Sequence, residues 1–232
     1  MKKARLILIR HGESVYNQKN IFTGWTDVDL SQQGIEEAKA VGKTLLRHNI
    51  YPDICFTSWL KRAIHTAQLA LKELEWEHID AVKSYKLNER HYGDWQGRDK
   101  EEIKEEYGEE KFLSIRRGYD VAPPSLPLND SRMAKNDKKY VNIKEELLPL
   151  SESLKDTKKR VIEYYHEKIE AQLQENKTVL ISAHGNSLRA LVMYLEQMSE
   201  KAIVNFEIPT GEIIIYTLDE KLNIINKDTF IG

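Results

Sequence analysis

Two short apolar runs along the chain end in the same dipeptide. Residues 6–12 read Leu-Ile-Leu-Ile-Arg-His-Gly, and residues 179–185 read Val-Leu-Ile-Ser-Ala-His-Gly. Short runs rich in Ile, Val and Leu are typical of strands that are buried on both faces of a parallel sheet. Ligands of such sheets bind beyond the carboxyl ends of the strands. The pattern therefore predicts that His11 and His184 face one pocket.

Apolar positions spaced by three and four alternate with these runs and predict helices. Ser31 can cap a helix that ends near Asn49. Its inner face would carry Ile35, Ala38, Val41, Leu45 and Leu46. Further helices are expected over 60–74, 153–174 and 187–195, and further strands over 54–57, 81–84, 212–218 and 223–228. The alternation predicts a single α/β domain over residues 1–232, a three-layer sandwich whose mainly parallel central sheet is flanked by helices.

Residues 100–150 interrupt this alternation. They contain two short charged helices, near 101–107 and 110–117, and then a loop that holds three prolines. Long segments without regular structure are uncommon in compact domains and often serve function. We therefore expect an inserted excursion of loop and helix that covers the mouth of the sheet.

The charge balance excludes a bulk electrostatic affinity for nucleic acid or an anionic membrane. Lysine and arginine total 35 against 37 acidic residues, a formal net charge of −2, so any anion site must be built locally. The first apolar run is too short for a signal peptide or a membrane span, which predicts a cytoplasmic protein. The single cysteine, Cys55, lies in a predicted strand and is expected to be a buried structural thiol.

The two histidines suggest phosphoryl transfer. A neutral imidazole such as His11 can attack phosphorus and form an N-phosphohistidine, provided that its second nitrogen is held by a hydrogen bond. The equatorial oxygens of the phosphoryl group need cations, for which Arg10 and Arg62 are candidates. Glu89 follows the predicted strand at 81–84 and could donate and accept the proton of the alkoxide. The remaining histidines lack metal-ligand spacing, so no metal is expected.

The constellation closely resembles the cofactor-dependent phosphoglycerate mutases of the histidine phosphatase superfamily, along nearly the whole chain. The matching stretches are LILIRHGES at 6–14 with Asn17, FTGWTDVDLS at 22–31, TSWLKRAIHT at 57–66, KLNERHYG at 86–93, RRGYDVAPP at 116–124, LPLSESLKDT at 148–157, SAHGNSLRAL at 182–191 and IPTG at 208–211. Arg-His-Gly alone is a weak signal that many phosphatases share. The whole set in this order is specific.

The resemblance implies that 2,3-bisphosphoglycerate phosphorylates His11, which then converts 3-phosphoglycerate to 2-phosphoglycerate. Glu89 would be the general acid and base, and His184, Arg10 and Arg62 would hold the transition state. The implied substrate-binding residues are Ser14, Asn17, Thr23, Gly24, Arg90, Tyr92, Lys100, Arg116, Arg117, Gly185 and Asn186. The resemblance also implies a homodimer or a homotetramer.

The chain departs from the family pattern near the pocket, where Trp95 replaces an expected leucine and Arg98-Asp99 replaces Leu-Asn. Asp94 and Asp99 add negative charge, so we expect them to point away or to pair with Arg90, Arg98 or Lys100. The sequence ends at Gly232, where many family members carry a further tail over the site. Easier access of water to the phosphohistidine would raise phosphatase leakage.

Two other functions fit the residues. A hydrolase would discharge the same phosphohistidine to water and release inorganic phosphate. A non-catalytic phospho-ligand binding protein would bind without turnover, although it would be free to lose His11, Glu89 or His184, and all three are present.

Overall fold

The computed structural model describes residues 3–232 and contains one six-stranded sheet of order β3-β2-β4-β1-β5-β6. The strands are β1 (Arg5–Arg10), β2 (Ile54–Thr57), β3 (Ala81–Lys83), β4 (Thr178–Ala183), β5 (Glu212–Leu218) and β6 (Ile224–Ile231). The first four strands in that order run parallel, whereas β5 pairs antiparallel with β1 and β6 pairs antiparallel with β5. The predicted mainly parallel sheet is thereby confirmed.

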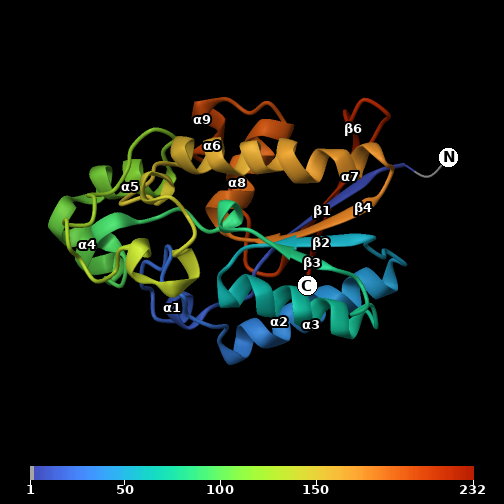
Figure 1. Ribbon diagram of the computed structural model, residues 1–232, viewed down its shortest axis with the longest axis horizontal. Helices are drawn as coiled ribbons and strands as arrows, with labels where there is room; N and C mark the ends of the chain where they lie inside the picture. The colour runs from blue at the N-terminus through green and yellow to red at the C-terminus, as the bar shows by residue number, and fades with distance from the viewer. Residues whose placement is uncertain (1–2) are drawn as a thin grey trace.

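Helices cover both faces of the sheet, which gives the expected three layers (Figure 1). The helices on the faces of the sheet are α2 (Gln32–Arg47) and α3 (Lys61–Glu73) on one side, and α6 (Leu154–Tyr164), α7 (Glu170–Gln174) and α8 (Gly185–Leu195) on the other. The π-helical turn η6 (Tyr165–Ile169) joins α6 to α7. The remaining elements are α1 (Val15–Gln18), α4 (Lys100–Tyr107), α5 (Glu109–Arg117), α9 (Glu200–Ile203), η1 (Tyr85–Leu87), η2 (Gly93–Trp95), η3 (Ala134–Asn136), η4 (Lys138–Tyr140) and η5 (Glu145–Leu147). No helix within residues 3–232 combines the length and the apolar character that a bilayer span requires.

The core consists of one apolar layer on each side of the sheet. Successive side chains of β1 point to opposite faces, so Leu6 and Leu8 pack toward α6–α8 while Ile7 and Ile9 pack toward α2 and α3. The predicted inner face of α2 is partly wrong, because the Leu46 side chain is 41% exposed. Gly42 is buried there instead, and its backbone approaches the Ala70 carbonyl of α3 so closely that a Cβ atom would lie 2.3 Å from it.

The excursion lies beyond the carboxyl ends of the parallel strands, at the left of Figure 1. Helices α4 and α5 are held there by an aromatic cluster whose centre, Trp95, is fully buried against Phe22 and Phe112. This tryptophan is therefore a packing residue. The cluster positions both ends of the α4–α5 pair near the carboxyl ends of the parallel strands.

Candidate active site

Neighbouring strands bring the two histidines together. Arg10 at the end of β1 is in register with Ala183 at the end of β4, and the His11 amide donates to the Ala183 carbonyl at 3.0 Å. The imidazole of the next residue, His184, therefore lies beside that of His11, with ring centroids 4.9 Å apart. The parallel pairing of two His-Gly strands is the direct cause of this contact.

His11 is held in the form that can attack phosphorus. Its Nδ1 lies 2.7 Å from the Gly12 carbonyl, which can only accept, so we assign the ring proton to Nδ1. Nε2 then keeps its lone pair and accepts from Arg62 Nε at 3.3 Å. Burial, together with the charges of Arg62 and Arg10, lowers the pKa of His11 well below its usual value. The imidazole is therefore neutral at physiological pH.

This assignment predicts the titration of His11. Its pKa is lowered in the fold, so the ring stays neutral at pH values where a free imidazole, with a pKa of about 6.5, becomes charged. We expect the ring resonances of His11, assigned by their loss in His11→Asn, to be constant between about pH 5.5 and 8 in NMR spectra. A midpoint within that interval would contradict the assignment.

His184 is placed behind His11 rather than in the cavity wall. We expected both rings to face the pocket, but only His11 lines the cavity and His184 is fully buried. The hydroxyl of Ser58 lies 2.8 Å from His184 Nε2, and Nδ1 has no partner among the described residues. Burial lowers the pKa of His184 well below its usual value, so this ring is also neutral.

Two arginines lie beside His11. Arg62, in the first turn of α3, is buried and donates to the carbonyls of Gly24 at 2.8 Å and Thr26 at 3.0 Å. Burial lowers its pKa to about 10, which still leaves it charged at neutral pH. Arg10 donates to the Ile208 carbonyl, while its Nε has no partner within the described part of the chain. Both guanidinium groups line the cavity.

Glu89 is oriented by the first turn of α8. Its carboxylate accepts from the backbone amide of Asn186 at 3.1 Å and from that of Arg90 at 2.7 Å. The amino terminus of a helix carries partial positive charge and stabilises a carboxylate. Glu89 is 9% exposed and lines the same cavity as His11.

Most of the predicted substrate-binding residues line this cavity. They are Asn17, Thr23, Gly24, Tyr92, Lys100, Arg116, Arg117, Gly185 and Asn186. Lys100 opens α4 while Arg116 and Arg117 close α5, so the excursion supplies the outer cations.

Ser14 and Arg90, which were also predicted to bind substrate, lie behind the residues that line the cavity. The Ser14 hydroxyl donates to Asn17 Oδ1 at 2.8 Å and is fully buried. Arg90 is also fully buried and donates to the carbonyls of Ile115 and Arg116 at 2.8 and 3.0 Å. It holds the end of α5 in place.

The sequence analysis missed two charged residues of the cavity wall, Arg189 and Glu207. Arg189 donates to Asn186 Oδ1 at 2.8 Å and to the Arg117 carbonyl at 3.1 Å. It follows Asn186 by three residues on α8, and that spacing places both on one helix face. Glu207 forms an ion pair with Arg117, and only its position beside the IPTG stretch could have indicated it.

The two aspartates near the pocket do not line the cavity, in agreement with the first expected alternative, and their partners are not the ones considered in the second. Asp94 forms an ion pair with Arg132 of the excursion at 2.6 Å. Asp99 caps α4 by accepting from the Glu101 amide at 2.8 Å. Arg90 was a wrong partner because backbone carbonyls and the Tyr92 hydroxyl occupy its donors.

His91 and Cys55 are both buried in the fold. Burial lowers the pKa of His91 to about 4 and raises that of Cys55 to about 12. Cys55 is fully buried, as expected. Within residues 3–232, no group of three or more His, Cys, Asp and Glu side chains is arranged to hold a metal ion.

The cavity fits a polyanionic phosphate. Arg10 Nε, in the cavity wall, is buried without a partner in the described chain and can donate to a phosphoryl oxygen. A Cβ atom at Gly185 would lie 3.5 Å from Arg10 and 3.7 Å from Glu89, so the glycine keeps open the space between them. Six cationic side chains and two carboxylates line the wall, a formal excess of four positive charges.

Comparisons with known proteins agree with this geometry. The model of the histidine phosphatase superfamily (branch 1) matches residues 6–227. A similar fold occurs in a mycobacterial glucosyl-3-phosphoglycerate phosphatase, with a TM-score of 0.74 and 20% identity over 99% of this chain and 98% of that one. The α-ribazole phosphatase of Shigella flexneri has a TM-score of 0.68 and 24% identity, with 96% and 94% covered. These two likenesses concern the fold alone.

The fold and the paired histidines define a member of the histidine phosphatase superfamily. A 2,3-bisphosphoglycerate-dependent phosphoglycerate mutase of Lachnoclostridium phytofermentans is 52% identical over 97% of this chain and 90% of its own length. The enzyme of that name from Staphylococcus carnosus is 49% identical over 96% and 97%. Within the superfamily, the chain belongs to the family of 2,3-bisphosphoglycerate-dependent phosphoglycerate mutases.

Proposed function

We propose that this protein interconverts 3-phosphoglycerate and 2-phosphoglycerate, in glycolysis and gluconeogenesis, through a phosphohistidine at His11 that 2,3-bisphosphoglycerate primes. The observation that best supports this proposal is the placement of His11. Its imidazole is neutral, and its Nε2 faces Arg62 in a cavity lined by six cationic side chains. A bisphosphorylated glycerate carries a charge of about −4 to −5. The formal excess of four positive charges in the wall nearly balances it.

In the first half of the proposed cycle, Glu89 accepts the proton of the substrate hydroxyl. The freed oxygen attacks phosphorus, a new O–P bond forms, and the bond between phosphorus and His11 Nε2 breaks. Arg10, Arg62 and His184 stabilise the charge on the equatorial oxygens during the transfer. Arg62 and the Gly12 carbonyl keep the released imidazole oriented.

In the second half, the bisphosphate has turned so that its other phosphoryl group faces His11. Nε2 attacks this phosphorus, while Glu89 returns its proton to the departing alkoxide oxygen and 2-phosphoglycerate is released. No proton is gained or lost over the cycle. Lys100, Arg116 and Arg117 hold the carboxylate and the phosphate that does not react, so the bisphosphate stays in the cavity while it turns.

The test combines labelling with product analysis. Protein incubated with phosphorus-labelled 2,3-bisphosphoglycerate should carry an acid-labile label that maps to His11. With catalytic bisphosphate, 3-phosphoglycerate should then yield 2-phosphoglycerate and little inorganic phosphate. Predominant release of inorganic phosphate would identify a hydrolase instead, and binding without turnover would identify a phospho-ligand binding protein.

Removal of an outer cation should weaken substrate binding more than it slows chemistry. Burial lowers the pKa of the Lys100 ammonium, and the charge of Arg116 lowers it further, which indicates a site suited to an anion. Hydrogen bonds to charged groups contribute about 1.5–3 kcal/mol, so Lys100→Met should raise the KM for 3-phosphoglycerate by about 10- to 100-fold. Steady-state kinetics measure this, with Lys104→Met on the same helix as the control. An unchanged KM would contradict the assignment.

We further propose that residues 1–232 act as a single domain in the cytoplasm, where glycolysis supplies phosphoglycerates. The family resemblance supports a homodimer or a homotetramer. Light scattering on the purified protein would determine the assembly, and fractionation of the producing cells would determine the location.

A further inference from the structure

The segment that carries Glu89 lies outside helices and strands. It connects η1, which ends at Leu87, to η2, which begins at Gly93. Its backbone therefore lacks the ladder of hydrogen bonds that fixes the residues next to His11 and His184. Buried backbone groups are nearly always paired, so other side chains must supply the partners.

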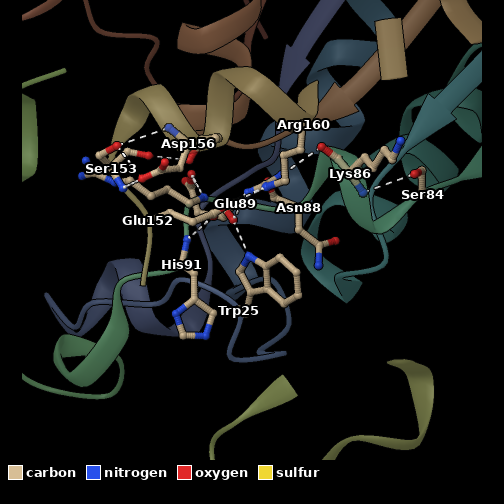
Figure 2. A network of polar contacts seen from close by, with 12 residues as sticks. Trp25, Ser84, Lys86, Asn88, Glu89, His91, Glu152, Ser153, Asp156 and Arg160 are labelled. Atoms are coloured by element: carbon tan, nitrogen blue, oxygen red, sulfur yellow. Dashed lines mark hydrogen bonds and ion pairs between the residues drawn. The ribbon is translucent and has the colours of Figure 1, made fainter. Parts of the chain in front are cut away.

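Arg160 of α6 supplies two of them and a third to η1 (Figure 2). Its Nη1 donates to the carbonyls of Lys86 at 2.8 Å and Asn88 at 2.9 Å, and its Nη2 donates to the carbonyl of Glu89 at 2.8 Å. The remaining bonds go to Glu152, from Nε at 2.7 Å and from Nη2 at 2.8 Å. A guanidinium group has five N–H donors. All five are thus occupied within the protein, and none is left for a ligand.

Glu152 also holds the segment that carries Glu89, through His91. Its Oε2 accepts from the His91 amide at 2.8 Å, and its own amide donates to the His91 carbonyl at 2.9 Å. Glu152 directly precedes Ser153, the residue that caps α6, and Arg160 lies two turns further along the same helix. The Arg160 side chain is only 12% exposed, and that of Glu152 only 5%.

Trp25 is the third residue that holds this segment. Its Nε1 donates to the same Glu89 carbonyl, at 2.6 Å, and the Arg160 guanidinium carbon lies 5.7 Å from the centre of its ring. Neither Arg160 nor Glu152 lines the cavity, so neither contacts a ligand that is bound there.

We propose that Arg160 and Glu152 are positioning residues for proton transfer by Glu89. This inference rests on the proposed function, in which Glu89 is the general acid and base. Proton transfer requires hydrogen-bond reach, and a misplacement of about 1 Å can slow a reaction 100-fold. A lysine at position 160 would keep the charge, but its three rotatable donors cannot reproduce the planar fork of five.

The experiment compares two phosphate donors for His11 in a single turnover. An alkoxide of phosphoglycerate needs a proton as it leaves, whereas the nitrophenolate of p-nitrophenyl phosphate leaves without one. Arg160→Lys should slow phosphorylation by 2,3-bisphosphoglycerate by about 10- to 100-fold and phosphorylation by p-nitrophenyl phosphate less than about 3-fold. Glu89→Gln should show the same selectivity. In the Glu89→Gln background, Arg160→Lys should cost less than about 3-fold, because it acts through Glu89.

The outcomes separate the two proposals. If Glu89→Gln slows both donors equally, the assigned role of Glu89 is wrong. If Glu89→Gln is selective but Arg160→Lys slows both donors equally, or keeps its full effect in the double variant, Arg160 is merely structural and the inference is wrong. Glu152→Gln retains the contacts of Arg160 with the backbone and serves if Arg160→Lys fails to fold. It should show the same selectivity with a smaller loss. Lys159→Met, exposed on the same helix, is the control.

Discussion

Replacement of His11 by asparagine is expected to abolish mutase activity and the acid-labile label together. Asparagine can still donate to the Gly12 carbonyl, as Nδ1 does now, but it has no nucleophile at the position of Nε2. No phosphoenzyme can then form, and loss of the nucleophile removes the whole covalent route. We expect kcat/KM to fall at least about 10⁴-fold, measured by conversion of 3-phosphoglycerate.

The control for this variant is another histidine outside the cavity. His65 lies in α3, is partly exposed and contacts Asp29 at 2.6 Å. His65→Asn should retain the label and near-normal turnover. A label that survives in His11→Asn, or that maps to His184, would show that a different imidazole carries the phosphoryl group.

Replacement of Arg62 by methionine is expected to slow the transfer by about 10²- to 10³-fold, the usual cost of removing a buried group that stabilises the transition state. It should also change the pH dependence. The charge of Arg62 lowers the pKa of His11, so its removal should move that pKa upward. A larger fraction of His11 is then protonated near pH 6. As the pH is lowered, the activity of the variant should therefore begin to fall at a higher pH than the activity of the parent.

NMR titration of His11 and rate measurements over the same pH range would test both effects. Lys61→Met is the matched control, because Lys61 precedes Arg62 in α3 and its side chain is exposed. If Arg62→Met leaves both the rate and the His11 pKa unchanged, the electrostatic coupling that we derive from the 3.3 Å contact is wrong.

The repeated pattern of an apolar strand ending in His-Gly was sufficient to predict that His11 and His184 lie close together, but not that only His11 lines the cavity. The spacing of the hydrophobic positions is a local property of the sequence. For that reason β1, β4 and the helices between them were predictable from the sequence alone. The excursion was predictable as an irregular segment, because its charged helices and prolines interrupt that periodicity. Glu89 was predictable because it follows the strand at 81–83, which ends at the same edge of the sheet.

Contacts between distant segments were not predictable. Charge could not assign the partner of Asp94, because Arg132 lies 38 residues away along the chain. Sequence also could not distinguish Arg117 in the cavity wall from Arg90 behind it, since both are arginines within matching motifs. Burial decides between these two roles, and burial depends on how the excursion packs around Trp95.

The local order of residues thus determined which elements form and which chemistry gathers where the strands end, because strand periodicity and residue type are local properties. Only the tertiary structure decided that His184 stands behind His11, that Arg189 joins the cavity wall, and that Arg160 holds the segment of Glu89. The first depends on the pairing of β1 with β4, and the other two depend on where α8 and α6 pack. A side chain finds its hydrogen-bond partners there only after separate elements have been brought together.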